Sequence, residues 1–198
     1  MKKWILFIAT ILSLCSNVAR ANDLVDGIGA YSKDNYAQAL KLLRPLATTQ
    51  GNADAQYYLG LMYVYGKGVT QNHGKAVKLY RLAAGQGHES AQITLGLMYV
   101  YGGDVTRDYQ EAVKFLRLAA AQGNADAQYQ LGWMYEGGEG VIQDYVRAYM
   151  WLSLAASNED KSAKINLEKL AKEMPPTQIA EAQKMALDCE KSSYKNCE

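Results

Sequence analysis

Few side chains in this chain have the type and spacing that chemistry requires. There are two histidines, His73 and His88, and neither has a cysteine or a second histidine at the spacing of a metal site. Both stand where a short apolar periodic segment begins, a place where polar residues commonly cap helices. We therefore interpret them as local capping or solvent-facing residues, and we expect no bound metal and no cofactor.

One short motif could indicate a nucleophile. Residues 192–195 fit S-x-x-K, the serine–lysine motif of penicillin-recognising enzymes. The S-D-N and K-T-G motifs that complete such a site do not accompany it, and the segment is a polar tail. Carboxylates such as Glu111 and Asp126 are interpreted as solvent-facing or capping residues, and the glycine loops follow predicted helices rather than strands. The sequence favours a protein without a catalytic site, with a cell-envelope enzyme or β-lactamase-like protein as the alternative.

The strongest pattern in the chain is a repeat of 36 residues. The motif A-Q-x-x-L-G-x-M-Y-x-x-G begins at Ala55, Ala91 and Ala127. The copies at 55–90 and 91–126 agree at 21 of 36 positions, and those at 91–126 and 127–162 agree at 15. A fixed period in this range is typical of stacked supersecondary units, each burying its apolar face against its neighbours.

Each copy contains two apolar periodic segments, which in the first copy predict helices over 53–65 and 73–85. We name the first helix of each repeat helix A and the second helix B. Helix A should end at a left-handed glycine and helix B should begin at a polar N-cap. The expected terminal glycines of helix A are Gly66, Gly102 and Gly138, and the expected N-caps of helix B are Asn72, Asp108 and Asp144.

Glycine also recurs inside helix A, at Gly60, Gly96 and Gly132. A glycine there costs about 1 kcal/mol relative to alanine. Its repetition predicts a close approach of helix B, and the Ala-Ala pairs of helix B, such as 83–84, suit the matching side.

The whole chain therefore predicts an all-α fold, a right-handed solenoid of antiparallel helix pairs with about ten helices after signal removal. The expected organisation is a signal peptide at 1–21, an N-terminal partial repeat or cap at 22–54, repeats at 55–90, 91–126 and 127–162, capping helices at 163–190 and a polar tail at 191–198.

The first residues predict export. A basic start at Lys2 and Lys3, a short apolar run and the small residues around Arg20 are typical of a signal peptide cleaved after Ala21. No later apolar run is long enough to span a membrane. Removal of Lys2, Lys3 and Arg20 leaves 18 basic and 20 acidic residues, a net charge of −2, which argues against nucleic acid as a partner. We expect a periplasmic or secreted protein.

Two cysteines, Cys189 and Cys197, remain after signal removal, and both lie in the last ten residues. In an oxidising compartment they can form a disulfide that closes a short loop. The alternative is a pair of free thiols on a frayed terminus.

The repeats resemble the Sel-one-like repeat (SLR), a branch of the tetratricopeptide-type helical solenoids. The residues of the first copy that carry the resemblance are Ala55, Leu59, Gly60, Tyr63, Gly66, Gly68, Val69, Ala76, Ala83, Ala84 and Gly87. In the second copy Asp104 replaces the second glycine of the loop, which puts that loop's conformation in doubt. The resemblance implies an adaptor or regulator that binds other proteins. Some similar proteins with a cysteine pair in every repeat bind penicillin, but the repeats here contain no cysteine.

Helix A carries a second apolar face, opposite the side that bears Ala55, Leu59 and Tyr63. Either adjacent A helices pack together and bury it, or it lines a groove for an apolar or aromatic-bearing peptide. The candidate groove residues are Tyr57, Tyr58, Leu61, Tyr65, Ile93, Leu97, Tyr101, Tyr129, Gln130 and Trp133. Trp133 is the best single anchor. The predicted function is an exported adaptor or regulator that binds a partner polypeptide of unknown identity.

Overall fold

The computed structural model describes residues 22–103, 105–195 and 197, so the predicted signal peptide at 1–21 lies outside the described residues. Every regular element within the described residues is a helix. Residues 22–32 are helical, and in the rest of the described chain the helices are α2 (Tyr36–Thr48), α3 (Ala53–Tyr65), α4 (His73–Gly85), α5 (Glu89–Tyr101), α6 (Tyr109–Ala120), α7 (Ala125–Gly137), α8 (Tyr145–Ser157), α9 (Lys161–Glu173) and α10 (Pro176–Lys191). The predicted all-α fold of about ten helices is confirmed.

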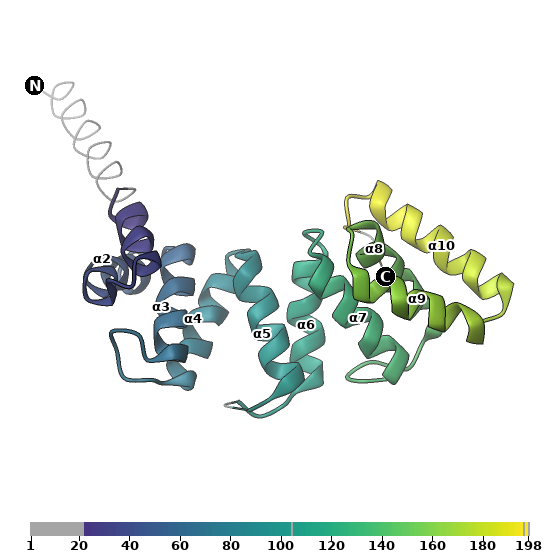
Figure 1. The fold of residues 1–198 in the computed structure, drawn as a ribbon, viewed down its shortest axis with the longest axis horizontal. Helices are drawn as coiled ribbons and strands as arrows, with labels where there is room; N and C mark the ends of the chain where they lie inside the picture. The colour runs from purple at the N-terminus through teal and green to yellow at the C-terminus, as the bar shows by residue number, and fades with distance from the viewer. Residues whose placement is uncertain (1–21, 104, 196, 198) are drawn as a thin grey trace, which may run out of the picture. The chain divides into compact units, whose positions relative to one another are not determined.

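The helices form two compact units, the first ending at Gln86 and the second beginning at Gly87. In the first unit α3 packs against α2 and α4. In the second unit α5 packs on α6, α6 on α7 and α7 on α8, and α8 also contacts α9 and α10 (Figure 1). The most extensive contacts join the helix A and helix B of one repeat, in the pairs α3–α4, α5–α6 and α7–α8.

Local signals place the helix ends. The side chain of Asn72 accepts a hydrogen bond from the backbone of Lys75, and Asp144 does the same for Arg147, so both act as N-caps. Gly66 and Gly138 end helix A with left-handed backbone, at φ 67° and 71°. Gly102 has φ 69° but ψ −135°, so the second copy leaves helix A differently, in the loop that contains Asp104. Asp104 itself lies outside the described residues.

The glycines inside helix A stand against large side chains of helix B. A Cβ added at Gly60 would lie 2.5 Å from Cε1 of Tyr80, whose ring is fully buried. The equivalent contacts are Leu116 at 2.6 Å from Gly96 and Leu152 at 2.7 Å from Gly132. The expected close approach of helix B is present, but a large side chain fills the space, not the alanine pair we expected. Glycine is needed because the facing residue is bulky.

A buried glutamine fixes each helix A at its start. The side-chain amide of Gln56, which is 3% exposed, donates to the carbonyl of Ala47 at the end of α2 and accepts from Gln86 at the end of α4. This pairing satisfies a polar group that would be costly to bury alone. The corresponding bonds in the second unit run from Gln122 to Gln92 at 2.7 Å, from Asn158 to Gln128 at 3.1 Å and from Gln128 to the carbonyl of Ala120 at 3.5 Å.

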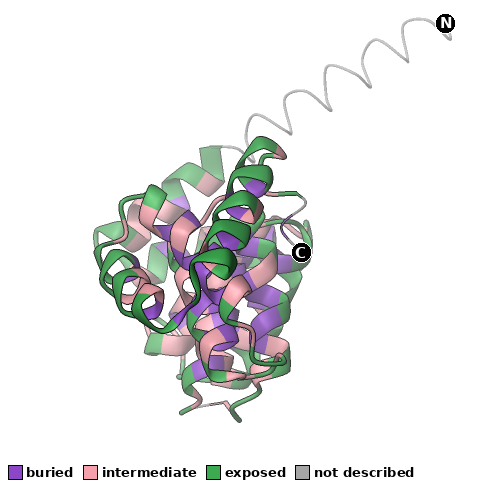
Figure 2. Cartoon of the chain, turned by 90° about the vertical axis from the view of Figure 1, so that its right-hand side faces the viewer, coloured by how far each residue is buried: buried purple, intermediate pink, exposed green. Residues whose placement is uncertain are grey.

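Each unit has its own apolar core, and Figure 2 shows buried residues on the inner sides of helices that are exposed on their outer sides. The core of the second unit extends into the C-terminal tail. Cys189 and Cys197 are joined by a disulfide, both are buried, and Tyr194 packs against the same core. The tail that we expected to be polar therefore folds back on the unit at these residues.

Candidate functional site

The residues with possible catalytic chemistry have local structural roles. Nδ1 of His88 accepts a hydrogen bond from the backbone of Ala91 at 3.1 Å and so caps α5, as expected. His73 is the first residue of α4. In the S-x-x-K segment, the hydroxyl of Ser192 donates to the carbonyl of Cys189 at 2.8 Å, a bond typical of a helix end, and Lys195 is exposed. No group of three metal-ligating side chains lies together within the described residues.

In the first unit, the candidate groove residues have partners within their own unit. The ring of Tyr58 meets that of Tyr31 edge to face at 5.4 Å, and Tyr57 contacts the rings of Tyr58 and Tyr80. Tyr57, Tyr58 and Leu61 are half-buried. Tyr65 is 63% exposed at the end of α3. In this unit the predicted face is therefore partly closed by its own neighbours.

In the second unit, the corresponding face joins α5, α7 and α9. The amide of Gln130 donates to the hydroxyl of Tyr101 at 3.1 Å, which links α7 to α5. The amide of Asn166 donates to the hydroxyl of Tyr129 at 3.1 Å, which links α9 to α7. Two aromatic residues of the face stay accessible, Tyr101 at 64% and Trp133 at 37% exposed. The last candidates, Ile93 and Leu97, are half-buried.

A cleft of about 450 Å³ opens beside Trp133. Its lining residues are Trp133, Glu136, Gly137, Tyr145, Asn166 and Lys169, from α7, α8 and α9. Gly137 occupies the repeat position that holds Tyr65 in the first copy and Tyr101 in the second. The absence of a ring there leaves room between α7 and its neighbours. The centres of the Trp133 and Tyr109 rings lie 6.4 Å apart, so Tyr109 packs against one side of the indole.

The cleft combines aromatic surface with both signs of charge. Burial raises the pKa of the Glu136 carboxyl, the charge of Glu173 raises it further, and Lys169 opposes the shift. An amide, a carboxylate and an ammonium group beside an indole can orient a polypeptide backbone while an apolar side chain meets the ring.

Sequence reasoning identified Trp133 but missed Glu136, Asn166 and Lys169. The available signal was the glycine at position 137, where the earlier repeats carry tyrosine. Asn166 and Lys169 follow the last repeat, so no periodic pattern could assign them to this cleft.

Within the described residues, every helix is too short or too polar to span a lipid bilayer.

Comparison with known proteins agrees with this architecture. The Sel1 repeat protein from Oxalobacter formigenes has a similar crystal structure, with 36% identity and a TM-score of 0.61 over 67% of this chain and 98% of that one. The chain is also similar to c5321, a protective antigen of uropathogenic Escherichia coli with an SLR fold, at 30% identity and a TM-score of 0.58. That match covers 79% of this chain and 42% of the antigen. No curated protein matches the sequence.

The Sel1 repeat itself matches at four places, residues 24–48, 53–88, 89–124 and 125–160. The first match lies within the segment 22–54, which we expected to be a partial repeat. Each later match begins two residues before a copy of the motif, at 55, 91 or 127. The four matches cover more than half of the chain. The protein therefore belongs to the Sel1 repeat family, whose members are generally adaptors in protein–protein interactions.

Proposed function

We propose that this protein is an adaptor that binds a partner polypeptide on the helix A face of its second unit, with Trp133 as the anchor. The observation that carries the proposal is a tryptophan 37% exposed beside a cleft of about 450 Å³. Tryptophan is enriched among the residues that dominate binding energy at protein interfaces. The chain belongs to the Sel1 repeat family, whose fold is typically a scaffold without enzymatic activity, and this supports an interaction role over a catalytic one.

The surroundings of Trp133 suit a peptide. Tyr145 lines the same cleft and adds aromatic area with few rotatable bonds, so little conformational entropy is lost on binding. Asn166, Glu136 and Lys169 offer a donor, an acceptor and a cation at the walls of the cleft. A partner segment with an apolar side chain flanked by polar backbone and charged groups satisfies all of them.

We further propose that the protein acts outside the cytoplasm, in the periplasm or after secretion. The support is the sequence of residues 1–21, with its basic start, short apolar run and small residues before the expected cleavage after Ala21. The partner is then another exported or envelope protein.

The test is substitution of Trp133 by alanine in the full chain. Partners captured by crosslinking in intact cells would be identified by mass spectrometry, and their affinity measured with purified proteins. We expect a loss of about 2 kcal/mol, or roughly 30-fold in affinity, with thermal stability nearly unchanged.

The matched control is Leu118→Ala, which removes an apolar side chain 44% exposed on α6 of the same unit, outside the cleft. This variant should bind normally. If Trp133→Ala binds as well as the native protein, or if it unfolds the unit, then Trp133 is not a binding anchor.

A further inference from the structure

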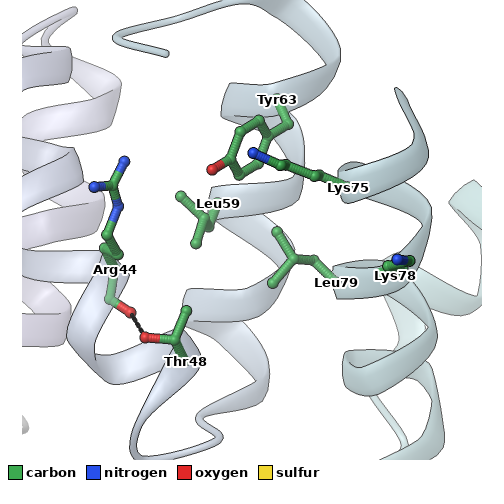
Figure 3. A pocket seen from close by; sticks show the side chains of 7 residues that line it. All are labelled: Arg44, Thr48, Leu59, Tyr63, Lys75, Lys78 and Leu79. Carbon is green, nitrogen blue, oxygen red and sulfur yellow. Dashed lines mark hydrogen bonds between the residues drawn. The ribbon is translucent and has the colours of Figure 1, made fainter. Parts of the chain in front are cut away.

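The first unit holds a second cavity, of about 270 Å³, between α2, α3 and α4. Figure 3 shows Leu59 and Leu79 at its centre and the cations at its edges. Its lining residues are Arg44, Thr48, Leu59, Tyr63, Lys75, Lys78 and Leu79. The hydroxyl of Thr48 donates to the carbonyl of Arg44 at 2.8 Å, so its hydrogen is used within α2. The cavity therefore has an apolar floor and a basic rim.

The cavity exists because Leu79 is small for its position in the repeat. The equivalent residues of the next two repeats are Phe115 and Trp151, 36 and 72 positions later. Both rings are buried, with 5% and 3% exposed, whereas Leu79 is only half-buried. An apolar group from outside can fill the space that a ring fills in the other repeats.

The positive charges at the rim are not balanced by acidic residues among those that line the cavity. Helices α2 and α4 contain no aspartate or glutamate, and the cavity is lined by three cations and no acid. The ammonium group of Lys75 lies 5.3 Å from the centre of the Tyr63 ring, and no acidic residue of the described chain lines the cavity beside it. Like charges at i and i+3 on a helix, as at Lys75 and Lys78, weaken the helix slightly.

The second repeat carries residues of opposite charge at the positions of Lys75 and Lys78. There Glu111 replaces the first lysine and pairs with Lys114 at 3.6 Å. In the third repeat the equivalent cation, Arg147, forms an ion pair with Asp144. Within the described residues, Lys75 and Lys78 of the first repeat form no comparable ion pair and can meet an anion from a partner.

We propose that this cavity binds an acidic polypeptide segment with one apolar anchor side chain, of leucine to phenylalanine size, between its carboxylates. A cavity of roughly 150 Å³ already holds benzene, so about 270 Å³ accommodates one such side chain and part of its backbone. The anchor contacts Leu59 and Leu79, and the carboxylates lie beside Arg44, Lys75 and Lys78. This site is separate from the Trp133 cleft and does not depend on it.

The experiment measures binding of three capped peptides by fluorescence anisotropy at low salt. The first is Glu-Glu-Phe-Glu-Glu, the second replaces its glutamates by glutamine, and the third replaces its phenylalanine by alanine. We expect saturable binding of the first, weakening as salt is added, and affinities at least about tenfold lower for the other two.

Two variants test the location. Lys75→Glu installs the residue type of the second repeat, so it should fold normally and weaken the first peptide by about tenfold. Leu79→Trp installs the residue type of the third repeat and should abolish binding by filling the cavity. Lys33→Glu is the charge control, because it makes the same change in net charge at an exposed residue of the first unit outside the cavity. It should bind like the native protein, as should Trp133→Ala.

Several outcomes would overturn the proposal. Equal binding of the alanine peptide, or an equal loss in Lys33→Glu, would mean diffuse charge attraction. Undiminished binding by Leu79→Trp would place the peptide elsewhere. Binding of the protein to vesicles of anionic lipid, with no binding of any peptide, would make the cavity a lipid site.

Discussion

Gly60→Ala should destabilise the first unit, although alanine normally strengthens a helix. In an unobstructed helix the exchange is worth about 1 kcal/mol in favour of alanine. Here the new Cβ would lie 2.5 Å from Cε1 and 2.8 Å from Cδ1 of Tyr80, while ordinary contacts begin at 3.4 Å. The ring must withdraw by 0.9 Å (3.4 − 2.5), and it is 0% exposed.

The magnitude follows from which parts can move. A tyrosine ring is rigid, and the ring of Tyr57 lies 5.7 Å from that of Tyr80, so α3 and α4 must separate. Overpacking of this kind costs about 1–3 kcal/mol, and we expect its upper end. After the helical gain, the net loss is about 2 kcal/mol, or a fall in melting temperature of roughly 4–8 °C.

The assay is thermal and urea unfolding followed by circular dichroism. Gly29→Ala is the matched control, because it lies in the helical segment 22–32 and its added Cβ meets nothing within 4 Å. It should stabilise by up to about 1 kcal/mol. In a Tyr80→Ala background the cost of Gly60→Ala should be smaller, because the ring that meets the new Cβ is gone. If Gly60→Ala is as stable as Gly29→Ala, the two helices are not in the contact described.

Three further predictions concern the second unit. Gln128→Ala removes the bonds to Ala120 and Asn158 and should cost about 1–3 kcal/mol in urea unfolding, whereas Gln130→Ala, on the half-exposed face, should cost far less. The native state raises the pKa of the Glu136 carboxyl, so ionisation of this group opposes folding. Glu136→Gln should therefore be as stable as the native protein at acidic pH and become more stable than it as the pH rises above 4.5. A difference in stability that is constant across pH would contradict this. Reduction of the Cys189–Cys197 disulfide should speed hydrogen exchange in α10 and leave α2–α4 unchanged, and equal acceleration in both units would contradict the local role of the bond.

The helices could be predicted to the residue where their end signals are local. In the first copy, α3 and α4 occupy the expected residues 53–65 and 73–85, because Asn52 and Asn72 cap their starts and Gly66 ends the first. Each of these signals acts within four residues of its helix end. Repetition then made the assignment secure, since three copies carry the same signals.

Packing partners could not be predicted in the same way. The glycine at position 60 indicated a close approach, but only coordinates identify Tyr80, not an alanine, as the group that approaches. The C-terminal tail is a similar case. The sequence offered a disulfide or a frayed end, but its polar composition did not indicate that Cys197 is buried in the core with Tyr194 packed beside it.

The two candidate sites have one feature in common: each includes a position at which one copy of the repeat differs from the other two. Agreement among copies identifies the residues that the fold needs, because each unit must bury the same surface. Both proposed binding surfaces include a position where one copy has a smaller residue: Gly137 stands in place of tyrosine in the cleft beside Trp133, and Leu79 stands in place of an aromatic ring in the basic cavity. In a helical repeat protein, the exceptions to the motif are therefore better guides to function than the motif.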